Sequence, residues 1–388
     1  MHDSEPQLRD LAPTDFDSVI RVRNRSFEMM TGSADGWKAD ASEFCQGRRY
    51  LGVFDGDRAV AAARIWDFTQ WWGGRRVPMA GIAGVVVAPD HRGRGVGSRL
   101  MRGILARSRE LGFPLSALYP ASVPVYRKLG YEYGGGRYRF SFPTQALRLL
   151  GGQDVPIREG GPADASRVLE LVATVRGPGR ESGMLGWTEK PVRDWLAKEE
   201  TFCYLADDGF VVYGWDGGDL RIDELVAGSG ATARALWSTV GSGASIAKRV
   251  RAFVSPQDPI HLMLGTEAEH QAHIERWMLR VLDPSAAVAA RGWPPGLSLD
   301  LPLEIDDAEI PHNSGSWRLE VGDGVGALTR SESERGLRLA ARGLAGWYAG
   351  TPLASLRLAG VASGGRHEDD GLLDAATRGP TPYMVDYF

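Results

Sequence analysis

The stretch AGIAGVVVAPDHRGRGVGSRLMRGILARSREL, residues 80–111, decides the fold of this chain. It opens with a nearly all-apolar run, Ala80–Ala88, which is typical of a strand that is covered on both faces. Pro89 ends this run because proline cannot donate a hydrogen bond to a sheet. From Ser98 to Leu111 apolar residues recur at helical spacing, and Gly112 is a suitable helix stop. We therefore expect a buried strand, a glycine loop and an amphipathic helix.

The loop between this strand and helix reads Arg92-Gly93-Arg94-Gly95-Val96-Gly97. Its glycines allow the backbone to approach an anion closely, and its free N–H groups lead into a helix N-terminus, which favours a pyrophosphate. Arg92 and Arg94 add positive charge and directional donors. The glycine spacing fits neither the dinucleotide fingerprint nor the P-loop. Taken alone, the loop predicts an anion site, and a plain turn is the alternative.

Strand and helix signals surround this stretch on both sides. Before it we expect a strand, a helix that follows Thr14-Asp15, and a hairpin whose turn is Asp55-Gly56-Asp57. After it we expect a strand, a short helix and a closing strand. In chain order the expected strands and the short helix are Gln7–Leu11, Leu51–Asp55, Ala59–Asp67, Leu115–Tyr119, Val123–Leu129 (helix) and Tyr138–Phe142.

Two further units follow. VPIREGGPADASRVLEL, which begins at Val155, echoes QLRDLAPTDFDSVIRV near the start of the chain, although coincidence is an alternative. In this unit Ala227–Trp237 could form a second glycine loop and helix, and His261–Leu264 a strand. A third unit begins near Met278 with a strand that enters a helix. Its later elements are expected at Leu297–Ile305, Ser316–Val321 and Gly326–Thr329 (strands) and at Leu337–Tyr348 and Thr351–Ala359 (helices).

The composition of the chain excludes several classes of protein. The chain has 388 residues, 43% of them hydrophobic and 24% charged, so it can bury several cores. A formal charge of −4 gives no general attraction for nucleic acid. No apolar run is long enough to span a membrane, and neither the cysteines nor the histidines have metal-ligand spacing. We expect a soluble cytoplasmic protein without a metal, a nucleic-acid partner or a membrane partner.

The strand, the Arg-x-x-Gly-x-Gly loop and the following helix together resemble the coenzyme A loop of GNAT acetyltransferases. The chain length, the segment LRVLDPSAAVAARGW and the ending PTPYMVDYF extend the resemblance to the Eis-like branch of that family. The resemblance implies a mixed α+β and α/β fold, with tandem GNAT-type mixed-sheet units followed by a sterol-carrier-protein-like α+β domain. The implied domains are residues 1–150 (catalytic GNAT), 151–280 (degenerate GNAT) and 281–388 (sterol-carrier-like).

The same resemblance implies acetyl-CoA as cosubstrate and assigns its contacts. The backbone of Val85, Val86 and Val87 would pair with the pantetheine, while the loop from Arg92 to Gly97 (Arg92, Gly93, Arg94, Gly95, Val96 and Gly97) and Ser98 would hold the pyrophosphate. Ser122 would contact the coenzyme. The second unit lacks an Arg-x-x-Gly-x-Gly run, so one coenzyme site is expected per chain.

The implied reaction is acetyl transfer to a primary amine of a small polycationic substrate, aminoglycoside-like or lysine-like. By resemblance Tyr126 is the general acid and the C-terminal carboxylate of Phe388 is the general base, although simple packing of Tyr126 and a frayed chain end are the plain alternatives. A homo-oligomer, a hexamer by resemblance, is also implied. Two other functions stay open: a biosynthetic acyltransferase that uses another acyl-CoA, and a non-catalytic protein that binds acyl-CoA or lipid.

Overall fold

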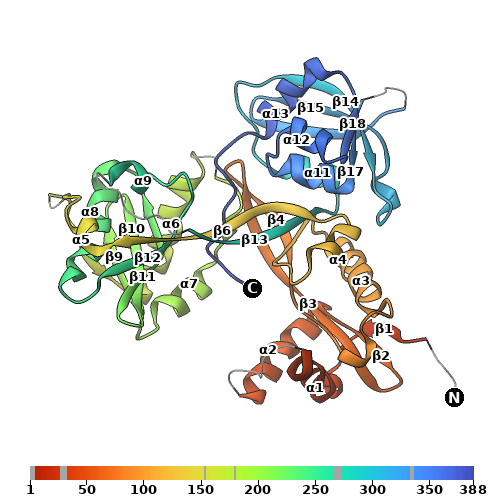
Figure 1. The fold of residues 1–388 in the computed structure, drawn as a ribbon, viewed down its shortest axis with the longest axis horizontal. Coiled ribbons are helices and arrows are strands. Elements are labelled where there is room, and N and C mark those ends of the chain that lie inside the picture. The colour runs from red at the N-terminus through yellow and green to blue at the C-terminus, as the bar shows by residue number, and fades with distance from the viewer. Residues whose placement is uncertain (1–4, 27–32, 153, 179–180, 265–271, 333–335) are drawn as a thin grey trace.

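The computed structural model describes residues 5–26, 33–152, 154–178, 181–264, 272–332 and 336–388. Within them, a 13-stranded sheet runs through the first two units and a separate 5-stranded sheet forms the third. Figure 1 shows the three units around a centre where four long strands meet: β3 (Arg58–Trp72), β4 (Arg75–Val87), β6 (Glu132–Pro143) and β13 (His273–Val281). The expected mixed α/β architecture, with two GNAT-type units and a third α+β unit, is confirmed.

The first unit follows the expected order, but several strands are longer than the sequence predicted, and two helices, α2 (Ala34–Gln46) and the short α5 (Thr144–Arg148), were not predicted. Helix α2 begins where Ser33 accepts a hydrogen bond from the amide of Gly36, and it buries Phe44. The other elements are β1 (Gln7–Asp10), α1 (Phe16–Ser26), β2 (Tyr50–Asp55), β3 (Arg58–Trp72), β4 (Arg75–Val87), α3 (Val96–Glu110), β5 (Leu115–Leu118), α4 (Val123–Lys128) and β6 (Glu132–Pro143).

The second unit contains the expected helix after its own glycine segment, but one expected strand is wrong. Residues His261–Leu264 belong largely to helix α9 (Ile260–Met263), which begins after Pro259 where the Asp258 carboxylate accepts the amide of Ile260. A short apolar run has no clear periodicity, so the sequence could not separate strand from helix there. The other elements are β7 (Arg158–Gly160), α6 (Ala165–Arg176), β8 (Leu185–Gly186), α7 (Glu189–Leu196), β9 (Phe202–Ala206), β10 (Gly209–Asp216), β11 (Asp219–Ala227), α8 (Gly230–Gly241) and β12 (Arg249–Phe253).

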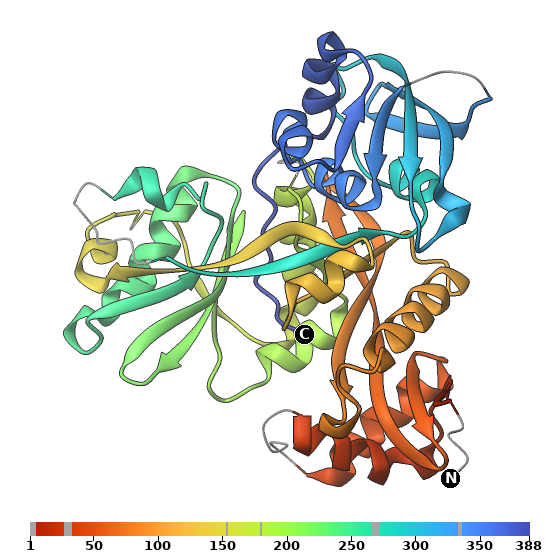
Figure 2. The same cartoon turned by 45° about the vertical axis from the view of Figure 1, so that its right-hand side comes forward.

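The first two units share strands. Strand β13 (His273–Val281) pairs antiparallel with β5 on one side and with β6 on the other. Strand β6 in turn pairs with β12 of the second unit. Figures 1 and 2 show β6 and β13 crossing together from one unit to the other. Strand pairing therefore crosses the expected domain boundaries at residues 150 and 280. The positions of these boundaries stay a prediction.

In the third unit the start of one predicted helix is wrong. The helix predicted from Leu337 begins only at α11 (Ala341–Tyr348), because Leu337–Ala340 forms strand β17 and pairs parallel with β14. The alternating LRLA pattern, buried and exposed in turn, is that of a half-buried strand. The other elements are α10 (Pro284–Ala290), β14 (Leu299–Asp306), β15 (Gly315–Gly322), β16 (Val325–Arg330), α12 (Leu353–Leu358), β18 (Ala362–Gly364) and α13 (Asp370–Thr377).

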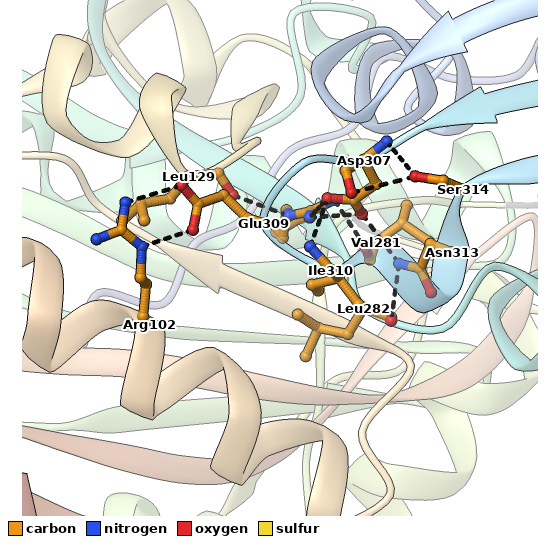
Figure 3. A network of polar contacts seen from close by, with 10 residues as sticks. Arg102, Leu129, Val281, Leu282, Asp307, Glu309, Ile310, Asn313 and Ser314 are labelled. Carbon is orange, nitrogen blue, oxygen red and sulfur yellow. Dashed lines mark hydrogen bonds and ion pairs between the residues drawn. The ribbon is translucent and has the colours of Figure 1, made fainter.

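A buried polar network fastens the third unit to the first. Arg280 of β13 donates to both carboxylate oxygens of Asp307, at 2.6 and 2.7 Å, and to the carbonyl of Leu129 just after α4, at 3.0 Å. Asp307 also accepts from the side chain of Asn313 and from the amide of Ile310 (Figure 3). The helix α4 is therefore tied at its end to a residue of the third unit.

The final segment of the chain leaves the third unit and returns to the centre of the molecule. Its backbone exchanges hydrogen bonds with Gly136 of β6, through Pro382 and Met384, and the amide of Tyr383 donates to Ser182. Figure 2 places the chain end, marked C, between the second unit and β3. The segment thus connects all three units and delivers Phe388 to the first.

Candidate active site

The glycine loop forms an open turn at the start of α3. Gly93 and Gly95 have φ of 74° and 79°, in the left-handed region that favours glycine, and no atom lies within 4 Å of a Cβ built at either position. Gly95 is the N-cap residue of a 15-residue helix, so free amides at its first turn face outward. Arg92 and Arg94 are exposed beside them. Open backbone, a helix N-terminus and two guanidinium groups suit a pyrophosphate.

Strands β4 and β5 separate next to this loop. They pair in parallel only from Met79 with Leu115 to Gly81 with Ala117, although β4 continues to Val87. A register shift in the β3–β4 ladder falls opposite Gly84, whose φ of 61° marks a bulge in β4. The second half of β4 therefore has no partner on the β5 side, and its backbone borders an opening. The sequence predicted the strand but not the bulge.

A cavity of about 750 Å³ occupies that opening. It brings together four residues that the sequence singled out: Val85 and Val86 of β4, Tyr126 of α4, and Phe388 at the chain end. Val87, Ser98, Ser122 and the glycine loop do not line it. The carbonyl of Val87 accepts from Ser26 at 2.9 Å, and Ser122 is the exposed N-cap residue of α4.

Tyr126 has the surroundings of a proton donor. Its side chain is 7% exposed, and its ring meets that of Tyr131 edge to face at 6.0 Å. In the part of the chain that the structure describes, no hydrogen bond ties down its hydroxyl. Burial raises the pKa of Tyr126 to about 12. The hydroxyl is therefore protonated at neutral pH and free to donate into the cavity.

Tyr119, which the sequence did not single out, has a different task. Its hydroxyl donates to the carbonyl of Asp386 at 2.8 Å, and its ring lies 5.7 Å from that of Phe388. Burial raises the pKa of Tyr119 as well. Because its proton is already engaged, Tyr119 serves to hold the chain end. The sequence carries no signal for this role, since Tyr119 and Tyr126 differ only in what the fold brings to them.

Several contacts fix the chain end at the cavity. Arg137 donates to the carbonyl of Val385 at 2.9 Å, and the indole of Trp187 donates to the carboxylate of Asp386 at 3.2 Å. The Phe388 ring packs edge to face on Phe68 at 5.2 Å. The last residue is thus held from the backbone and from its side chain, in contrast to a frayed terminus.

The corresponding helix start in the second unit has its donors engaged. Ser229 caps α8 by accepting from the amide of Thr232, and the amide of Gly228 donates to the carbonyl of Asp208 at 2.7 Å. The Asp208 carboxylate also accepts from the hydroxyl of Thr232. The start of α8 therefore has a carboxylate bonded to its first turn, whereas the start of α3 has two exposed arginines beside it.

Within the described ranges, no group of three or more His, Cys, Asp or Glu side chains is arranged to hold a metal ion. Over the same ranges, each helix is too short or too polar to cross a membrane.

Comparisons with known proteins agree with this architecture. Family models for an acetyltransferase (GNAT) domain match residues 7–134 and again residues 183–281, and a sterol carrier protein domain matches residues 284–385. A crystal structure of a GCN5-related N-acetyltransferase from Kribbella flavida is 59% identical, with a TM-score of 0.96 over 99% of this chain and 98% of that one.

Curated proteins are also similar to this chain over most of its length. An uncharacterized N-acetyltransferase of Streptomyces avermitilis is 32% identical over 341 residues, which are 80% of this chain and 82% of that protein. The N-acetyltransferase Eis of Mycobacterium tuberculosis is 27% identical over 361 residues, 87% of each chain. The GNAT units imply acetyl-CoA as cosubstrate. The chain therefore belongs to the Eis-like GNAT N-acetyltransferases, with two GNAT units followed by a sterol-carrier-like unit.

Proposed function

We propose that this enzyme transfers the acetyl group of acetyl-CoA to a primary amine, with Tyr126 as general acid and the Phe388 carboxylate as general base. One observation carries the proposal: the unpaired half of β4, the free hydroxyl of Tyr126 and the anchored Phe388 all border one cavity of about 750 Å³. Each group arrives from a different part of the chain, so their meeting is a property of the fold.

The two groups supply the two proton transfers that aminolysis of a thioester needs. The Phe388 carboxylate takes a proton from the attacking amine, directly or through water, as the new C–N bond forms. Tyr126 donates its proton to the sulfur as the C–S bond breaks, so the coenzyme leaves as a neutral thiol. The carboxylate also stabilises the positive charge that develops on the nitrogen.

Other residues of the first unit would hold the coenzyme. The exposed loop from Arg92 to Gly97 and the first turn of α3, including Ser98, suit the pyrophosphate. The backbone of Val85 to Val87 suits the amides of the pantetheine, and Ser122 at the start of α4 lies near its path by family resemblance. We propose one such site per chain because Asp208 occupies the matching helix start of the second unit.

Replacing Tyr126 by phenylalanine tests the acid. We expect kcat to fall by about 10²- to 10⁴-fold, the usual contribution of general acid catalysis, while KM for acetyl-CoA changes little. Thiol release and product mass report the reaction. Tyr204→Phe, in the second unit, is the matched control and should leave both constants unchanged. Turnover by Tyr126→Phe equal to that of the parent would remove Tyr126 from the mechanism.

Extending the chain by two glycines after Phe388 tests the base. The extension moves the carboxylate away from the cavity and leaves the Phe388 ring available to pack on Phe68. We expect kcat to fall by at least tenfold, with an unchanged unfolding transition. An extended protein with full activity would exclude the terminal carboxylate as the base.

The acceptor and the assembly follow the family resemblance alone. A polycationic amine and a homo-hexamer are predictions of that resemblance, whereas a cytoplasmic location is a prediction from the composition. Product masses after reaction with acetyl-CoA, propionyl-CoA and longer acyl-CoAs distinguish an acetyltransferase from a biosynthetic acyltransferase, and light scattering measures the assembly.

A further inference from the structure

Two arginines also line the cavity. Arg23 comes from α1 and Arg64 from β3, and the aromatic residues Trp37 and Tyr50 line the same cavity. The mechanism of acetyl transfer uses neither arginine. Acetyl transfer therefore does not explain why both arginines border the cavity.

Arg64 is held in place by aromatic rings. Its guanidinium lies 4.9 Å from the ring centre of Trp66 and 5.3 Å from that of Phe44. Its Nε is buried and donates to no atom of the described residues. A buried donor without an acceptor costs about 1–3 kcal/mol, so native proteins seldom keep one without a reason.

Arg23 adds a like charge beside Arg64. Burial lowers the pKa of Arg64, and the nearby charge of Arg23 lowers it further. Tyr50 and, less strongly, Asp40 of α2 raise the pKa of Arg64, yet neither arginine is within ion-pair distance of a carboxylate among the residues that the structure describes. Two fully buried arginines of this chain do have such partners: Arg280 contacts Asp307 at 2.6 Å and Arg176 contacts Glu224 at 2.7 Å.

The carboxylates that border the cavity are not paired with these two arginines. Glu275 is engaged with Arg137 at 3.1 Å, and the Phe388 carboxylate is the proposed base. A third arginine, Arg276, also borders the cavity, 5.1 Å from the ring centre of Tyr133. A polycation would meet like charges here, whereas an anion would find two guanidinium groups and a free buried donor.

We propose that the acceptor amine carries an anionic group, a carboxylate or a phosphate, and that Arg23 and Arg64 receive that group. This inference rests on the proposed function, and it replaces a polycationic acceptor by an amino-acid-like or phosphorylated amine. The anion fixes the far end of the acceptor, which leaves its amine to reach the acetyl group between Tyr126 and Phe388. Trp37 and Tyr50 give the site flat apolar walls, which suit an acceptor with a flat apolar body.

Matched pairs of acceptors test the proposal. We would compare 4-(aminomethyl)benzoate with 4-(aminomethyl)benzamide, O-phosphoethanolamine with ethanolamine, and add kanamycin as a polycation. We expect at least one anionic member to exceed its neutral partner by tenfold or more in kcat/KM, and the pair that does so identifies carboxylate or phosphate. Equal constants within both pairs, or a preference for kanamycin, would overturn the proposal while the acetyltransferase function stands.

Charge-removing variants assign the preference to the two arginines. Arg64→Met and Arg23→Met should lower kcat/KM for the anionic acceptor roughly tenfold to a hundredfold, the range for charge-assisted hydrogen bonds, and leave the neutral partner and the KM of acetyl-CoA unchanged. Arg21→Met, an exposed position on the same helix, is the control and should change nothing. Variants that lower kcat/KM equally for both acceptors of a pair, or that raise KM for acetyl-CoA instead, would contradict the assignment. Absence of turnover with every amine would overturn the proposed function and this inference with it.

Discussion

Among the tyrosines of the cavity, the partner of each hydroxyl decides its chemistry. The resemblance to GNAT enzymes nominates Tyr126, on the short helix that follows β5, whereas the residues alone leave simple packing open. The sequence alone could not separate Tyr126 from Tyr119, since the hydroxyl of Tyr119 is engaged by the carbonyl of Asp386, a residue 267 positions away. It also gave no sign of Arg23 and Arg64, whose neighbours come together only in three dimensions.

The raised pKa of Tyr126 predicts the alkaline side of the pH profile. Burial raises this pKa to about 12, so the acid form persists below that pH and is lost only above it. We expect kcat/KM to rise with pH as the amine loses its proton, with no falling limb before about pH 11. Steady-state rates between pH 6 and 10 with an amine of known pKa check this. A falling limb near pH 9 that disappears in Tyr126→Phe would contradict the buried, protonated state.

Because the guanidinium of Arg92 is exposed beside the glycine loop, we expect its removal to weaken binding of the coenzyme selectively. Arg92→Ala should raise KM for acetyl-CoA by about tenfold, within the 1–3 kcal/mol of a charge-assisted contact, and leave kcat nearly unchanged. Arg109→Ala, near the other end of α3, is the matched control. Equal KM values in the parent and Arg92→Ala would count against the pyrophosphate assignment.

At the scale of elements, the predictable parts are those with local rules. The strand β4, its loop and α3 follow from an apolar run, glycines and helical periodicity, and all three are present. The helix α2 escaped prediction because ADGWKADASEFCQ has few apolar residues and a glycine in its first turn. Leu337–Ala340 reads as the start of a helix, but pairing with β14 holds it as a strand. In these four residues helix propensity conflicts with the strand-like alternation, and the sheet pairing decides the outcome.

The buried pair of Arg280 and Asp307 predicts a large effect on stability. Both side chains are at most 1% exposed, and Asp307→Ala would leave the guanidinium without its carboxylate. We expect a loss of about 3–5 kcal/mol in the free energy of unfolding, measured by denaturant titration. Asp306→Ala is the matched control one residue away, because Asp306 pairs with Arg338 at the surface and should cost at most about 1 kcal/mol.

The same variant tests whether the third unit positions α4. Arg280 donates to the carbonyl of Leu129, three residues after Tyr126, so a displaced guanidinium releases the end of that helix. Asp307→Ala should therefore also lower kcat at a temperature where the protein remains folded. Full kcat with reduced stability would limit the network shown in Figure 3 to a structural role.

At the scale of the whole molecule, strand order is what the sequence could not supply. Strand β13 reads as an ordinary apolar strand that precedes the third unit, yet it lies between β5 and β6 of the first. Side-chain alternation shows which face of a strand is buried, but it does not identify the neighbouring strands. For the same reason the sequence gives no hint that the chain end crosses all three units before it reaches β3.

This strand order predicts that the first unit does not fold alone. In a fragment of residues 1–150, β6 loses both of its partners, β12 and β13, and β5 keeps only its short pairing with β4. We expect the fragment to be aggregated or to lack a cooperative unfolding transition by circular dichroism, since exposed sheet edges pair with other chains. Co-expression with residues 151–388, which supply both missing strands and Phe388, should restore a soluble complex that acetylates an amine. A 1–150 fragment that unfolds cooperatively as a monomer would show that the shared sheet joins two independently stable units.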